Sequence, residues 1–132
     1  MAEPSFRFVC VPDALAGAPS GWAREMLRDG EIALLTGDGG LGAVNAVAHD
    51  LDLTSVPLVR GEESAKRQEQ TVMAYAENLP LVWVSAGFGD GASAWARDRG
   101  PMTLLVAAGG PLAEEERRRI ERFVATLGRQ SE

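Results

Sequence analysis

Two glycine-rich segments, each enclosing an aspartate, are the part of the sequence whose residue types and spacing point to chemistry. The first reads Thr-Gly-Asp-Gly-Gly-Leu-Gly-Ala and the second Ser-Ala-Gly-Phe-Gly-Asp-Gly-Ala. Glycine lets a ligand approach the backbone closely, and a helix that begins directly afterwards offers unpaired N–H groups to an anion. The segments therefore predict a binding site for a phosphorylated ligand, formed by Gly37, Asp38, Gly39, Gly40, Gly42, Gly87, Gly89, Asp90 and Gly91. Tight strand-to-helix turns are the alternative reason for such glycines.

Three aspartates have a possible role in the same site. Asp38 and Asp90 could hold a metal or ribose hydroxyls, or act as a general acid and base. Asp13 follows the first apolar segment and could line the site as well. Aspartate is also common in turns and at helix starts, where it accepts backbone N–H groups. A carboxylate would repel a bare phosphate, so the aspartates leave both a binding and a hydrolytic function open.

Other reactive side chains are few. Cys10, the single cysteine, lies in the apolar run Phe-Arg-Phe-Val-Cys-Val, which indicates a buried, inert thiol. His49 is the single histidine. A metal or catalytic site that needs two or three histidines, or cysteine together with histidine, is therefore not expected. We therefore expect no metal and no cofactor.

Charge and hydropathy exclude further classes of partner. The chain has 13 basic and 19 acidic residues, with a net charge of −6. Nucleic acid is not an expected partner, because no stripe of Lys and Arg is long enough to follow a phosphate backbone. No apolar stretch reaches the ~18 residues that a membrane span requires, and the N-terminus lacks the pattern of a signal peptide. We expect a cytoplasmic protein.

Alternating strands and helices must position the glycine-rich segments. Apolar runs predict strands over 6–11, 32–36, 56–60, 81–85 and 102–107. Several of the runs are continuous, as is typical of strands covered on both faces. Helical patterns predict helices over 20–28, 41–51, 62–78, 92–99 and 112–127, the last ended by Gly128. Nine of the 15 glycines follow predicted strands, at the edge of a parallel sheet where ligands bind.

The expected fold class is α/β: residues 1–132 form a single domain, a three-layer Rossmann-like sandwich. Its five-stranded, mostly parallel sheet would have helices on both faces. The common phosphate-binding fingerprints are absent. Gly42 is followed by Ala-Val and not by the Lys-Ser/Thr of a P-loop, and the turn after the first strand has no glycine.

One family resemblance remains. The segment from Leu35 to His49 is similar to the second-strand signature of the SLOG superfamily, in which a strand leads into a Gly-rich loop and a helix of small residues. The later order also resembles the YspA-like branch: an arginine, here Arg67, that opens a helix, then a strand, a second Gly-rich loop, a helix and Gly-Pro before the next strand. The resemblance spans about residues 31–108.

The resemblance implies a nucleotide or nucleotide-derived ligand held at the two Gly-rich loops. Gly37, Gly39, Gly40 and Gly42 would line one side, Gly87, Gly89 and Gly91 would grip a phosphate, and Arg67 would be a charged clamp. It also favours the strand order 3-2-1-4-5 over 2-1-3-4-5 and implies a homodimer. The hydrolase branch carries Pro-Gly-Gly-x-Gly-Thr and a following Glu, and this chain has neither the Thr nor the Glu.

The sequence thus predicts a small protein that binds a nucleotide or nucleotide-derived phosphorylated ligand without catalysing a reaction. One alternative is a hydrolase that cleaves an N-glycosidic or phosphate bond with Asp38, Asp90 or Asp13. The other is a non-catalytic protein-interaction module that kept the scaffold and lost the ligand.

Overall fold

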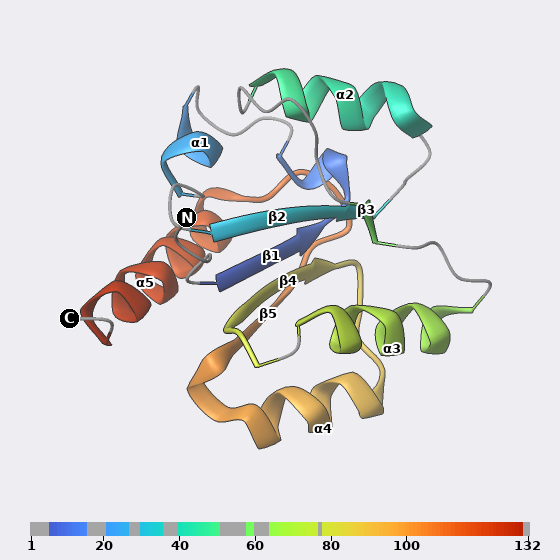
Figure 1. The fold of residues 1–132 in the computed structure, drawn as a ribbon, viewed down its shortest axis with the longest axis vertical. Coiled ribbons are helices and arrows are strands. Elements are labelled where there is room, and N and C mark those ends of the chain that lie inside the picture. The colour runs from blue at the N-terminus through green and yellow to red at the C-terminus, as the bar shows by residue number, and fades with distance from the viewer. Residues whose placement is uncertain are drawn as a thin grey trace.

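Apolar runs rich in β-branched and aromatic residues form a parallel sheet in the computed structural model of the chain, which is an α/β fold (Figure 1). The structure describes residues 6–15, 21–26, 30–35, 40–50, 58–59, 64–76 and 78–130. Four strands have five or six residues: β1 (Phe6–Cys10), β2 (Gly30–Leu35), β4 (Leu81–Ser85) and β5 (Thr103–Ala107). The two-residue β3 (Leu58–Val59) pairs with the end of β2.

The strands lie in the order β3-β2-β1-β4-β5, and all neighbouring pairs are parallel. This is the order that the family resemblance favours. Since parallel strands share one direction, all their carboxyl ends lie at the same edge of the sheet. The segments that follow β1, β2 and β4 therefore begin at one edge.

Helices cover both faces of the sheet (Figure 1). Helices α3 (Ala65–Ala76) and α4 (Asp90–Arg99) lie on one face. Helices α1 (Trp22–Met26), α2 (Gly40–Asp50) and α5 (Glu114–Gln130) lie on the other. Short 3-10 helices, η1 (Pro12–Leu15) and η2 (Gly100–Met102), follow β1 and α4. At the end of α4, Gly100 adopts a φ of 66°, which glycine accommodates without strain, and its N–H bonds back to the carbonyls of Ala96 and Arg97.

The alternation of side chains along each strand divides the apolar residues into two cores. Phe6, Phe8 and Cys10 of β1 face α1, α2 and α5. Val9 of β1 and Trp83 of β4 face α3 and α4. Strand β4 is buried on both faces, which explains why Leu-Val-Trp-Val is a continuous apolar run. In β1 the half-buried Arg7 interrupts the run.

The element boundaries differ from the predicted ones by a few residues. The strand predicted over 56–60 is represented only by the two residues of β3, because its neighbours lie outside the described residues. Helix α4 begins two residues earlier than predicted, at Asp90. The prediction that Gly128 ends the last helix is wrong: α5 continues to Gln130. A glycine inside a helix costs only about 1 kcal/mol, so it does not by itself terminate one.

Candidate functional site

A groove of about 610 Å³ lies between α3 and the segment that joins β4 to α4. One face of α3, the segment that follows β4 and the first turn of α4 meet there, beyond the carboxyl end of β4, where parallel sheets bind ligands (Figure 1). The groove is lined by Lys66, Glu69, Gln70, Met73, Gly87, Phe88, Gly89, Asp90, Gly91 and Ala92.

Helical spacing places four α3 side chains on the groove. Lys66 is followed by Glu69, Gln70 and Met73 at intervals of three, four and seven residues, which is one face of a helix. The helix starts cleanly because the Ser64 hydroxyl accepts the Arg67 N–H at 3.2 Å. The face that α3 presents to the groove thus carries one ammonium, one carboxylate, one amide and one thioether.

The opposite wall is the glycine-rich segment itself. The Ser85 hydroxyl donates a hydrogen bond of 3.0 Å to the Gly87 carbonyl, which fixes the exit from β4. Gly89 is the N-cap of α4 and has no side chain to cap the helix, and its carbonyl accepts the N–H of Ser93 at 3.0 Å. Asp90 occupies the first helical position and is exposed on the groove.

A side chain from α3 binds the backbone at the N-cap residue of α4. The Glu69 carboxylate accepts the backbone N–H of Gly89 at an N–Oε2 distance of 2.7 Å. The fit is tight, since a Cβ added to Gly89 would lie 3.0 Å from Glu69 Oε1. Glu69 therefore ties α3 to the glycine-rich segment across the groove.

The apolar part of the groove rests on an aromatic cluster. Phe88 packs edge-on against Trp83, with ring centroids 5.0 Å apart, and Trp83 packs against Trp95 at 6.4 Å. The Arg99 guanidinium lies 4.6 Å above the Trp95 ring. Trp95 is therefore a packing residue in this cluster, whereas Phe88 also lines the groove.

The structure brings together the second glycine-rich segment, with Gly87, Gly89, Asp90 and Gly91, and residues of α3. Arg67 is exposed on α3 but does not line the groove, and its neighbour Lys66 does.

The first glycine-rich segment is described only in part. Gly40 and Gly42 form the start of α2, on the other face of the sheet, and neither lines the groove. Gly37, Asp38 and Gly39 lie outside the described residues. Asp13 lies in η1, directly after β1, and its side chain is outside the described residues as well.

Sequence reasoning missed Lys66, Glu69, Gln70 and Met73 as groove residues. Their spacing along α3 was visible, but the same spacing fits any helix face. Only the packing of α3 beside the β4–α4 segment distinguishes this face from the others.

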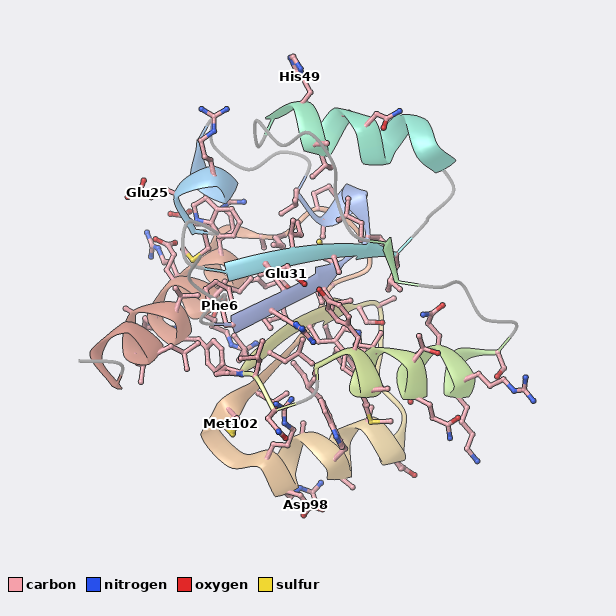
Figure 2. The ribbon with its side chains drawn as sticks, viewed as in Figure 1. Phe6, Glu25, Glu31, His49, Asp98 and Met102 are labelled. Carbon is pink, nitrogen blue, oxygen red and sulfur yellow. The ribbon has the colours of Figure 1, made fainter. Side chains whose placement is uncertain are left out.

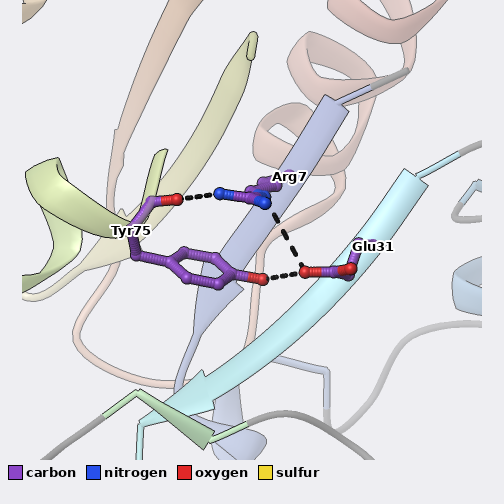
Figure 3. A network of polar contacts seen from close by, with 3 residues as sticks. All are labelled: Arg7, Glu31 and Tyr75. Atoms are coloured by element: carbon purple, nitrogen blue, oxygen red, sulfur yellow. Dashed lines mark hydrogen bonds and ion pairs between the residues drawn. The ribbon is translucent and has the colours of Figure 1, made fainter. Parts of the chain in front are cut away.

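A second polar cluster, also missed, joins β1, β2 and α3 (Figure 3). The Arg7 guanidinium donates to the Tyr75 carbonyl and lies 4.5 Å from the Tyr75 ring centroid. The Tyr75 hydroxyl donates to Glu31, which also lies 3.7 Å from Arg7 Nε. Burial and the hydrogen bond to Glu31 raise the pKa of Tyr75. The cluster links the three elements, and none of its three residues lines the groove.

The single cysteine and the single histidine do not line the groove. In the part of the chain that the structure describes, no group of three or more His, Cys, Asp or Glu residues could hold a metal ion. Cys10 is buried, and burial raises the pKa of its thiol, which keeps it unreactive. His49 lies exposed in the last turn of α2 and points away from the sheet (Figure 2). No helix among the described residues is both long and apolar enough to cross a bilayer.

Comparisons with known proteins found no matching family model, no similar curated protein and no similar solved structure.

Proposed function

We propose that this protein binds a nucleotide or nucleotide-derived phosphorylated ligand in the groove between α3 and the β4–α4 segment, and that it does so without catalysing a reaction. The observation that carries the proposal is the groove itself. Its volume of about 610 Å³ lies within the roughly 300–1,000 Å³ of typical small-molecule sites. It also opens at the carboxyl edge of a parallel sheet, where open α/β folds bind ligands.

The lining supports a ligand with an apolar part and a charged part. Met73, Phe88 and Ala92 offer an apolar wall for a base. Lys66 is exposed at the groove and supplies a positive charge for a phosphate. Glycines at positions 87, 89 and 91 leave the backbone of the opposite wall open to a ligand on either side of Phe88 and Asp90.

The proposal also includes the predicted binding residues that are not among the described groove residues. The sequence also predicts Gly37, Asp38, Gly39, Gly40, Gly42 and Arg67 as ligand-binding residues, and we keep that assignment as a proposal although none of those that the structure describes lines the groove. We further propose a complete three-layer, five-stranded Rossmann-like sandwich of the SLOG type, a cytoplasmic location and a homodimer. The order of the described strands and the helices on both faces support this fold.

A thermal-shift titration tests the binding. With AMP, ADP or ATP at ten times its Kd, the protein should gain about 1.4 kcal/mol of stability, by mass action. That corresponds to a Tm increase of roughly 4 °C for a domain of this size.

Lys66 supplies the control for that titration. Lys66→Ala should weaken binding by about fivefold, as expected for one exposed charge pair, while Lys66→Arg keeps the charge and most of the affinity. No shift with any of the three nucleotides would contradict the proposal and favour the protein-interaction module.

Hydrolysis is the second candidate, because two carboxylates share the groove. Glu69 and Asp90 both line it, and paired carboxylates are the usual machinery of glycosidic cleavage. Release of free base or inorganic phosphate from AMP, lost in Asp90→Asn with binding retained, would favour the hydrolase. Asp38→Asn and Asp13→Asn test the other two predicted carboxylates in the same assay.

A further inference from the structure

The Glu69 carboxylate occupies a backbone N–H of the glycine-rich wall from across the groove. It accepts the N–H of Gly89 at 2.7 Å, and its second oxygen lies against the open side of the glycine, at the position where a Cβ would come within 3.0 Å. Both residues line the groove. A carboxylate from the protein therefore sits where an anionic group of a ligand would bind the same wall.

The position has electrostatic consequences. A charge-assisted hydrogen bond to a backbone N–H is about twice as strong as a neutral one, so Glu69 is held firmly. Asp90 adds a second exposed carboxylate to the same wall, and Lys66 is the cation among the groove residues. A ligand phosphate must therefore displace Glu69 from Gly89 or stay beside it against like-charge repulsion.

An uncharged hydroxyl is not repelled by these carboxylates. A ribose or other sugar hydroxyl can donate to the free lone pairs of Glu69 or to Asp90 without displacing anything. The wall thus favours the sugar of a nucleotide over its phosphate as long as Glu69 remains hydrogen-bonded to Gly89.

We propose that Glu69 is an internal competitor that determines the specificity of the groove, lowering its affinity for a phosphate relative to the matching neutral nucleoside. This inference rests on the proposed nucleotide site and deepens it. Glu69 acts by occupying Gly89, so its removal should change the preference between ligands and not only the overall affinity.

The test compares adenosine with AMP in three proteins by isothermal titration calorimetry: the natural chain, Glu69→Gln and Glu121→Gln. The amide oxygen that Glu69→Gln introduces still accepts the Gly89 N–H, so the loop keeps its partner and loses only the charge. Glu121 is exposed on α5 and does not line the groove, so Glu121→Gln makes the same change in net charge elsewhere.

We expect Glu69→Gln to bind AMP about tenfold more tightly, the effect of removing one nearby like charge in a partly screened site, with adenosine changed less than about twofold. Glu121→Gln should match the natural chain. In an NMR titration, the Gly89 amide resonance should move when AMP displaces the side chain.

Three results would count against the inference. An AMP-to-adenosine ratio that is equal in the natural chain and Glu69→Gln, with both ligands bound, overturns it and leaves the proposed site intact. An equal change in Glu121→Gln makes the effect one of net charge. If neither ligand binds either protein, the nucleotide site itself is wrong, and the competitor role is lost with it.

Discussion

Tyr75 connects three elements through two polar atoms. Its carbonyl accepts the Arg7 guanidinium from β1, and its hydroxyl donates to Glu31 on β2 (Figure 3). Arg7 and Glu31 are paired residues of neighbouring strands, so the strand register itself brings the two charges together. The neutral phenol is the form that this arrangement stabilises, because burial and the Glu31 carboxylate both disfavour a second negative charge.

A pH titration tests whether the folded protein stabilises the neutral phenol of Tyr75. Tyr75 is the only tyrosine of the chain, so the phenolate absorbance near 295 nm reports it alone. Its folded-state pKa is raised above the ordinary value of about 10, so its contribution to stability is fully present below about pH 10. That contribution is lost as the pH rises through the higher folded-state value.

We therefore expect no phenolate signal in the folded protein at pH 10, and a signal on unfolding in urea at the same pH. Half-ionisation of the Tyr75 phenol near pH 10 in the folded protein would contradict the buried hydrogen bond to Glu31. A Tyr75→Phe variant, which keeps the ring and the carbonyl, serves as the blank for the absorbance.

At the scale of elements, β1 and β2 fit together through a glycine and an aromatic ring. Gly30 lies opposite Phe6 in the strand register. A Cβ at Gly30 would lie 2.5 Å from the Phe6 ring, and Phe6 is only 1% exposed, so the ring has no room to move.

Gly30→Ala should therefore destabilise the protein by about 2 kcal/mol, the usual cost of overpacking. Gly42→Ala is the matched control: nothing lies within 4 Å of its added Cβ, and its helical position in α2 favours alanine by up to about 1 kcal/mol. Urea unfolding measures the change in the free energy of unfolding for both variants. A smaller side chain in Phe6→Leu should recover part of the loss, and strictly additive effects of the two changes would argue against this contact.

The order of the described strands is the one that the family resemblance favoured, whereas the residue pattern alone left the order open. The longer strands were predicted from apolar runs such as Leu-Val-Trp-Val. The sequence did not predict the boundaries of the helices and strands to the exact residue. The glycine at 128 looked like a stop signal, but a helix that packs Ile120 and Leu127 into the core continues past it.

The groove shows where sequence reasoning ends. Its glycine-rich wall was predicted, because glycines after a strand have a local reason to be there. The α3 wall was not, since Glu69 reaches a residue 20 positions away only after the sheet has placed α3 and α4 side by side. Contacts of that range depend on the packed fold and not on a local pattern.

At the scale of the whole molecule, we expect the proposed homodimer to pair through β5. It is the last strand of the sheet, and within the described residues no strand pairs with its outer side. Its sequence, Thr-Leu-Leu-Val-Ala, has neither charge nor proline to discourage pairing. A second copy adding its own β5 would satisfy this edge in both chains.

Light scattering coupled to gel filtration should then give twice the mass of the 14.0 kDa chain. Ala107→Lys, at an exposed position of β5, should give the monomer with an unchanged circular dichroism spectrum. A monomeric natural chain would contradict the homodimer, and a dimeric Ala107→Lys would place the interface on another surface.

The aromatic cluster beneath the groove gives the molecule a built-in optical reporter. Phe88 touches the groove on one side and Trp83 on the other, at 5.0 Å between ring centroids. Any occupant that shifts Phe88 also alters the surroundings of a buried indole, whereas Trp22 lies on the other face of the sheet and stays a constant background. Tryptophan emission can therefore be used to screen unlabelled compounds for entry into the groove without any prior assumption about their chemistry.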